Sequence, residues 1–120
     1  MKTFADIKND PQIQKIENER DNHIDGFLLL HGGKRAFTFV CSIDKTPDGF
    51  AWEHVSVGIF NDWKKTPTWE EMCAVKKIFW QDNEEVHQIH PPEAQYIHHI
   101  GHLENILHLW RPVGGWEIER

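Results

Sequence analysis

The sequence predicts a small α+β domain, with a mostly antiparallel five-stranded sheet (order β-β-β-α-β-β) and one main helix packed on one face. Three observations favour this fold class. Apolar and polar residues alternate over residues 35–43 and 51–59, as in strands with one buried face. Residues 68–81 carry the capping signal and broad apolar stripe of an amphipathic helix. The length of 120 residues fits a single hydrophobic core.

The first two predicted strands form a hairpin over residues 27–31 and 35–43. The paired glycines between them, Gly32-Gly33, permit the positive φ angles that a tight turn requires. On the second arm, phenylalanine and other apolar residues occupy alternate positions and predict the buried side. A turn at residues 46–49, which contains both proline and glycine, ends this arm and leads to the third strand.

The third strand is predicted over residues 51–59, and a polar loop follows it. The main helix begins after Thr68, because Thr68 and Glu71 have the spacing of a capping box: the hydroxyl accepts from an amide three residues on, and the glutamate reaches back. We expect this helix to continue to about Gln81.

A fourth strand is predicted over residues 85–90, where Pro91-Pro92 would end it because proline cannot donate to a strand ladder. A histidine-rich connection then leads to a fifth strand at residues 106–111.

The chain divides into three predicted parts. Residues 1–25 form a polar extension, with Asp10-Pro11 able to begin a short helix. Residues 26–113 form the single α+β domain, and residues 114–120 form a tail.

Charge and composition exclude several classes of function. With 13 basic and 19 acidic residues the formal net charge is −6, which disfavours binding to a phosphate backbone. Residues 1–6 lack the pattern of a signal peptide, and the longest apolar run, residues 27–30, is far too short to span a membrane. The two cysteines, Cys41 and Cys73, are expected to be reduced and partly buried. We therefore expect a cytoplasmic protein.

A single helix covers only one face of a five-stranded sheet, so we expect the other face to be open. Alternation places a group of imidazole, indole and small polar side chains on that face: Thr38, Trp52, His54, Ser56, Gln88, His90, His108 and Trp110. Arg111, at the end of the fifth strand, is placed to clamp an anion or to form an ion pair with Glu53. Such a face suits a small ligand or a partner protein, and it also suits a homodimer interface. Alternatively, the sheet curls and buries these groups.

The nine histidines suggest metal chemistry. His54, His90 and His108 converge across neighbouring strands, so they could act as catalytic residues or form a zinc site with an open position. Otherwise we expect no cofactor. A second histidine group lies in the loop before the fifth strand and is more typical of a solvated surface: His98, His99 and His102.

His54-Val55-Ser56 also has the form of one half of a two-histidine phosphoesterase signature. A second copy would need another histidine with serine or threonine two residues later. It is missing, because the other candidates read His90-Pro91-Pro92 and His108-Leu109-Trp110. We therefore lean away from an enzyme.

Five ordered motifs resemble an uncharacterised family of short bacteriophage and prophage proteins. They cover about residues 50–113 and are Trp52–Val57, Pro67–Met72, Ile78–Trp80, Gln88–Pro92 with Tyr96, and Leu107–Pro112. The resemblance implies an infected bacterial cell as the location. It also implies an accessory role, such as antagonism of host defence by binding a host protein or a nucleotide signal.

The leading prediction is a phage-encoded binding protein that uses the open sheet face to hold a small, nucleotide-like ligand or a host protein. The alternatives are a metal-dependent or phosphoester hydrolase that uses the clustered histidines, and a structural homodimer without a ligand.

Overall fold

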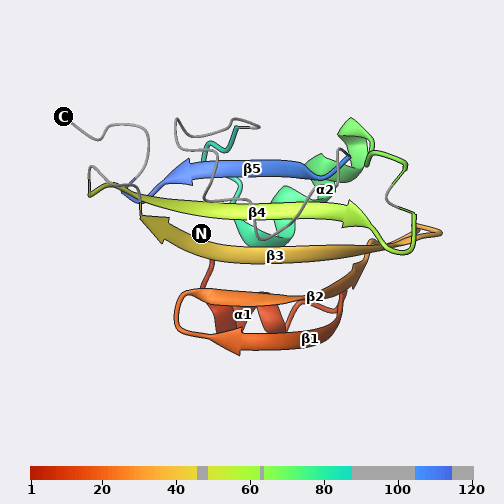
Figure 1. The fold of residues 1–120 in the computed structure, drawn as a ribbon, viewed down its shortest axis with the longest axis horizontal. Helices are drawn as coiled ribbons and strands as arrows, with labels where there is room; N and C mark the ends of the chain where they lie inside the picture. The colour runs from red at the N-terminus through yellow and green to blue at the C-terminus, as the bar shows by residue number, and fades with distance from the viewer. Residues whose placement is uncertain (46–48, 63, 88–104, 115–120) are drawn as a thin grey trace.

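The structure is a computed structural model, and it describes residues 1–45, 49–62, 64–87 and 105–114. Five strands form one antiparallel sheet in which neighbours in sequence are neighbours in space, β1-β2-β3-β4-β5 (Figure 1). The elements are α1 (Phe4–Lys8), β1 (Ile13–Arg20), β2 (His23–Leu29), β3 (Ala36–Lys45), β4 (Ala51–Ile59), α2 (Trp69–Phe79) and β5 (Leu107–Pro112). The predicted fold class, a five-stranded antiparallel sheet with one main helix, is confirmed. The predicted order β-β-β-α-β-β is wrong, because four of the described strands precede α2 and one follows it.

The N-terminal residues differ from the predicted extension, because they supply both a helix and an edge strand. The short helix begins after Thr3, whose hydroxyl accepts a hydrogen bond from the Asp6 amide at 3.1 Å, and it does not begin at Asp10. One helical side chain, Ile7, is fully buried. In β1 only two positions are partly buried, so the strand shows no alternation and is held by its pairing with β2.

The predicted strand at residues 85–90 is wrong for the part that the structure describes. Within residues 85–87 there is a single bridge, in which the His87 and Trp110 backbones exchange hydrogen bonds of 2.9 and 3.2 Å. Val86 is buried and belongs to the core, which accounts for the apolar pattern in this segment. Residues 88–90 lie outside the described residues.

The core lies between the sheet and the two helices, which lie on the same side of the sheet (Figure 1). We call this side of the sheet the inner face. Its centre is formed by alternate residues of β2, β3, β4 and β5, packed against one side of α2: Ile24, Leu28, Phe37, Phe39, Cys41, Val55, Val57, Leu109, Met72, Val75, Ile78 and Phe79. The predicted inward side of β3, β4 and β5 is thus confirmed.

Helix α2 begins as predicted. The Thr68 hydroxyl accepts from the Glu71 amide at 3.1 Å, and the Glu71 carboxylate accepts from the Thr68 amide at 2.8 Å. The helix ends at Phe79, slightly before the predicted end, because Trp80 has an extended backbone. Glu71 also forms a two-pronged ion pair with Arg35, which ties the helix start to the β2–β3 connection.

Both cysteines are free thiols, Cys41 buried and Cys73 half-buried, as predicted. Among the described residues, no helix has the length and apolar character needed to cross a membrane.

Candidate functional site

The predicted site residues of β4 and β5 do gather on the face of the sheet opposite the helices, which we call the outer face. The strand registers arrange this face in transverse rows. One row contains His23, Ser42, His54 and Trp110. The next row contains Asp25, Val40, Ser56 and His108. Alternation along each strand therefore predicted correctly which side chains share this face.

Two imidazoles form the centre of the outer face. His54 Nε2 lies 2.9 Å from His108 Nδ1, and the rings are inclined by only 17°, so one ring nitrogen donates directly to the other. On its other side, His54 Nδ1 lies 3.5 Å from Asp44 Oδ2, and this same oxygen accepts a hydrogen bond of 3.1 Å from the Ser42 hydroxyl. The result is a continuous chain from carboxylate to imidazole to imidazole.

The tryptophans beside this pair are already engaged in ring contacts. The Trp110 ring stacks on His54, with centroids 3.9 Å apart and planes inclined by 12°. Trp52 in turn meets Trp110 edge to face at 6.2 Å. One face of the Trp110 indole is therefore covered within the chain.

The expectation of an open face is wrong for these residues, because their side chains are buried. His54 is fully inaccessible to solvent, and Trp110, Ser56, His108 and Trp52 expose between 1% and 8% of their surface. The expected mixture of indoles and imidazoles thus lies inside the molecule.

Within the described part of the chain, burial leaves Ser56 Oγ and Trp110 Nε1 of this cluster without a hydrogen-bond partner. Buried polar groups are nearly always paired, because an unsatisfied donor or acceptor costs about 1–3 kcal/mol. Both atoms belong to side chains on the outer face, beside the imidazole pair.

Two open hollows lie on this face, one at each end. A polar hollow of about 350 Å³ is lined by the β1–β2 turn together with His23, Ser42 and Asp44. A groove of about 420 Å³ lies at the other end and is lined by Phe27, Thr38, Gly58, Ile59, Phe60, Asn61, Lys65, Asn105 and Ile106. Of the described groove residues, Thr38 was predicted on this face. Asp44 and Gly58 were not predicted, although continued alternation along β3 and β4 would have placed both on the same face.

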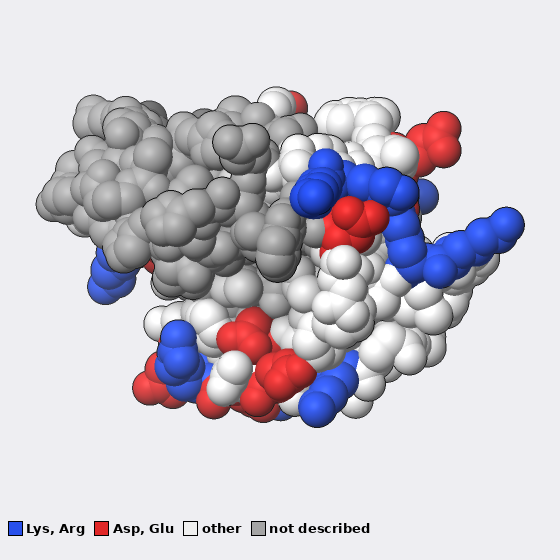
Figure 2. All heavy atoms as spheres, turned by 45° about the vertical axis from the view of Figure 1, so that its right-hand side comes forward, with Lys and Arg blue, Asp and Glu red and all other residues white. Residues whose placement is uncertain are grey.

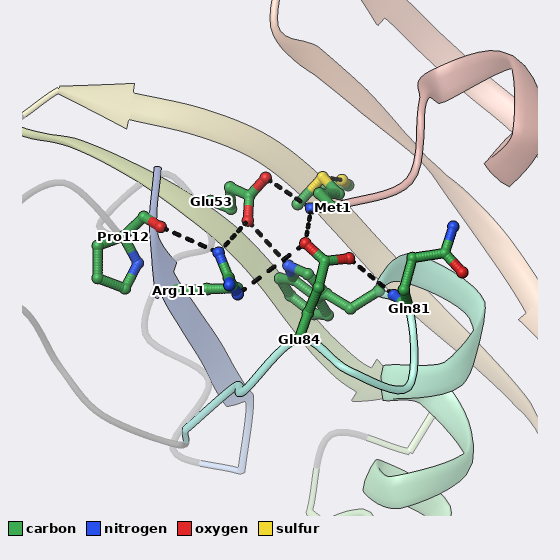
Figure 3. Close-up of polar contacts among 8 residues, drawn as sticks. Met1, Glu53, Gln81, Glu84, Arg111 and Pro112 are labelled. Atoms are coloured by element: carbon green, nitrogen blue, oxygen red, sulfur yellow. Dashed lines mark hydrogen bonds and ion pairs between the residues drawn. The ribbon is translucent and has the colours of Figure 1, made fainter. Parts of the chain in front are cut away.

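Arg111 lies on the inner face, away from the imidazole pair. Its Nη1 is 4.0 Å from Glu53 Oε1, its cross-strand partner, which is the ion pair predicted as one of its two roles. Its Nε is also 4.0 Å from Glu84 Oε2. Figure 3 shows the Met1 ammonium between the two carboxylates, at 2.9 Å from Glu53 and 2.5 Å from Glu84.

The two carboxylates of this group accept further hydrogen bonds. The Trp80 indole donates to Glu53 Oε1 at 3.1 Å, and the Gln81 amide donates to Glu84 at 2.8 Å. Burial by itself raises the pKa of Glu84, but hydrogen bonds from the Met1 ammonium and the Gln81 amide outweigh burial and hold the pKa below its ordinary value. These contacts give Arg111 a structural role, although its buried Nε makes no hydrogen bond among the described residues and lies 4.0 Å from Glu84.

The predicted zinc site is only partly covered by the described residues. Two nitrogen ligands of a tetrahedral zinc are about 3.4 Å apart, given Zn–N bonds of about 2.0–2.1 Å. The nitrogens of His54 and His108 are closer than this and form a direct hydrogen bond. Within residues 1–45, 49–62, 64–87 and 105–114, no three His, Cys, Asp or Glu side chains are grouped to hold a metal. Five predicted residues lie outside these ranges: Gln88, His90, His98, His99 and His102.

Comparison with known proteins identifies a family. The model of a domain of unknown function, DUF7694, matches residues 43–114. The matched segment begins near the end of β3 and continues just past β5, so it contains the imidazole pair, both tryptophans and Ser56. Neither the curated proteins nor the solved structures gave a match. Since the matched residues make up more than half of the chain, this protein belongs to the DUF7694 family.

Proposed function

We propose that the protein is a phage-encoded accessory protein that binds a small polar ligand on the outer face and does not chemically change it. The observation that carries this proposal is the pair of buried polar atoms that have no hydrogen-bond partner among the residues the structure describes, Ser56 Oγ and Trp110 Nε1. A ligand that supplies hydrogen bonds to both atoms recovers the free energy that their burial costs in the free protein.

The imidazole pair favours a ligand that hydrogen-bonds over one that stacks. A neutral imidazole both donates and accepts, so His54 and His108 suit a ligand with mixed polar groups. Trp110 has less to offer for stacking, because His54 already covers one of its faces. The polar hollow beside Asp44 supports a route of approach, since Asp44 lines the hollow and also contacts His54.

Burial also weighs against a macromolecular partner at this cluster. A homodimer or a host protein that used these indoles would need them at the surface, where aromatic side chains supply contact area. Trp52 and Trp110 expose at most 8% of their surface. A small ligand is therefore preferred to both of the other occupants considered from the sequence.

The likeness of residues 50–113 to short phage proteins supports the accessory role. A protein that sequesters a small polar molecule can act by lowering its free concentration, which is one way to antagonise a host defence that depends on a small signal.

The test is native mass spectrometry on untagged protein, purified gently from bacterial lysate with and without phage infection. We expect an added mass in the wild type that is lost in Ser56→Ala and in Trp110→Phe, since each variant removes one polar atom and keeps most of the side-chain volume. Trp80→Phe, which changes a buried indole on the inner face, should retain the added mass. A wild type without added mass under both conditions, or an equal loss in all three variants, would contradict the proposal.

The Asp44–His54–His108 chain favours a second candidate, an acid–base hydrolase. A carboxylate that orients one imidazole and, through it, a second imidazole is a known way to hold a base in the correct tautomer. Turnover of a nitrophenyl phosphodiester that is lost in His108→Gln and reduced in Asp44→Asn would favour this candidate over the binding protein. No turnover above the level of the His108→Gln variant would exclude it for phosphodiesters.

A further inference from the structure

The groove at the Phe60 end of the outer face differs chemically from the buried imidazole cluster. We propose that this groove is a second binding site, and that it accepts a planar aromatic molecule carrying a negative charge. The site is independent of the function proposed above, because it uses other residues and does not involve the imidazole pair.

The apolar part of the groove is already shaped to hold a ring. Phe27 and Phe60 meet edge to face, with centroids 4.8 Å apart and planes inclined by 80°, so that together they present an aromatic corner. Phe60 remains 42% exposed, which is unusual for a large apolar side chain that has a neighbouring apolar surface available. A volume of about 420 Å³ lies within the range of pockets that bind small molecules.

Gly58, which has no side chain, leaves room for Ile106 at the base of the groove. A Cβ atom at Gly58 would lie 2.3 Å from Ile106 Cδ1 and 3.4 Å from the Thr38 hydroxyl oxygen, so any other residue would displace Ile106. Because Gly58 has no side chain, Ile106 can lie flat on β4 as one wall of the groove.

The charge of the residues that line the groove favours a negatively charged ligand. Among the nine described residues that line the groove, Lys65 is the only charged one, although the whole chain has a net charge of −6. Asp62 lies 3.7 Å from the Lys65 ammonium, but both side chains are well exposed, and such pairs contribute little. An ammonium at the rim of an apolar groove favours an anion over a cation or a neutral molecule.

The surroundings of the groove point the same way. The β2–β3 connection and the loop after β4 lie at the same end of the sheet (Figure 1), and they carry two further exposed lysines, Lys34 and Lys64. Figure 2, with this end brought forward, shows Lys and Arg side chains gathered around a small acidic patch. The local field at this end is therefore more favourable to an anion than the overall charge suggests.

Two fluorescent dyes that share a ring system test the inference, namely anilinonaphthalene sulfonate and its uncharged analogue phenylnaphthylamine. The wild type should bind the sulfonate saturably and more tightly than the neutral dye. Lys65→Ala should weaken the sulfonate about three- to fivefold, which is the size of an exposed ion pair, and change the neutral dye less than twofold. Phe60→Ala should weaken both dyes, because both lose the aromatic corner.

Two further variants guard against indirect effects. Gly58→Val should weaken both dyes, because its side chain drives Ile106 out of its place. Val113→Ser changes another exposed apolar residue, at the far end of β5, and should change neither. Equal affinity of the wild type for both dyes would overturn the proposal, as would an unchanged sulfonate affinity in Lys65→Ala or in Phe60→Ala.

Displacement of the sulfonate dye then separates two natural sources of such an anion. Adenosine monophosphate that competes far better than adenosine would identify a nucleotide. Indole acetate that competes while adenosine monophosphate does not would identify an aromatic carboxylic acid. Failure of both to compete would overturn the assignment to a natural aromatic anion. Because Ser56→Ala leaves the groove intact, it should alter none of these dye measurements, which keeps this test separate from that of the imidazole cluster.

Discussion

Two buried tryptophans differ in one hydrogen bond, and this difference predicts unequal losses of stability for the same substitution. Trp80 and Trp110 expose 2% and 1% of their surface. Trp80 Nε1 donates to the Glu53 carboxylate at 3.1 Å, whereas Trp110 Nε1 has no hydrogen-bond partner in the structure. Replacement by phenylalanine removes a similar volume from each site, so the cavity contributions nearly cancel when the two variants are compared.

The remaining difference follows from the hydrogen bond. Trp80→Phe removes a bond to a charged acceptor, which contributes about 1.5–3 kcal/mol. Trp110→Phe removes a buried donor that costs the free protein about 1–3 kcal/mol, so this relief offsets part of the lost packing. Because the two contributions act in the same direction, we expect Trp80→Phe to be less stable than Trp110→Phe by about 2.5–6 kcal/mol.

Urea unfolding, followed by circular dichroism so that the lost fluorophore does not matter, measures both free energies of unfolding in ligand-free protein. Glu53→Gln provides an internal check: in that background Trp80→Phe should cost less, because its acceptor is no longer charged. If the two Trp→Phe variants lose the same stability, then Trp110 Nε1 is satisfied in solution. The main support for a ligand at the outer face would then be gone.

Two other perturbations test the fold. The hydrogen bond and charge of Arg35 lower the pKa of Glu71, so this ion pair stabilises the protein at pH values above the ordinary glutamate pKa of about 4.3 and is lost as the pH falls through the lower, folded value. Glu71→Gln should therefore be less stable than the wild type at neutral pH, and the difference should shrink steadily in urea titrations as the pH is lowered below that ordinary value. A difference that stays constant on acidification would contradict this account. A Cβ at Gly26 would lie 1.9 Å from the Lys15 carbonyl oxygen, so Gly26→Ala should force β1 away from β2. The loss of at least two hydrogen bonds should lower the free energy of unfolding by about 1–3 kcal/mol and speed amide exchange in β1. Protection of the β1 amides at the wild-type level would show that the strand adapts.

The parts of the fold that the sequence predicts well are those in which local pattern and local chemistry agree. β4 was predicted with its observed bounds because the alternation from His54 to Val57 marks a strand between the turn at residues 46–49 and the polar loop after residue 59. The start of α2 followed from Thr68 and Glu71, whose reciprocal hydrogen bonds depend only on their spacing. In contrast, β1 has almost no buried side chains, so its sequence has no periodic signal to read. Asp21-Asn22 is a local signal for a tight turn, because these residue types tolerate positive φ angles. Asn22 has a φ of 58° in the turn before β2.

For the site, alternation identified the face of each side chain but gave no measure of its depth. His54 and Ser56 share a face as predicted, yet both are buried, because burial depends on what the rest of the chain places over them. Arg111 shows the same limit from the other side. Its charge led to the prediction that it belongs to the binding residues of the open face. It lies instead on the inner face, where contacts with Glu53 and Glu84 give it a structural role.

The outer face of the sheet reverses the usual relation, in which apolar side chains are buried and polar side chains are exposed. On the outer face, polar groups such as His54 and Ser56 are enclosed, while an apolar corner at Phe60 is left in solvent. Neither arrangement lowers the free energy of the free protein: Ser56 Oγ has no hydrogen-bond partner among the described residues, and the exposed Phe60 leaves apolar surface hydrated. On the inner face, by contrast, the Glu53 carboxylate is matched by the Met1 ammonium and by Arg111. Uncompensated costs on the outer face are what a binding surface requires, because the ligand supplies the interactions that the free protein lacks. Substitutions that remove Ser56 Oγ or Trp110 Nε1 and keep most of the side chain should therefore weaken ligand binding, with smaller effects on stability than the matching Trp80→Phe on the inner face.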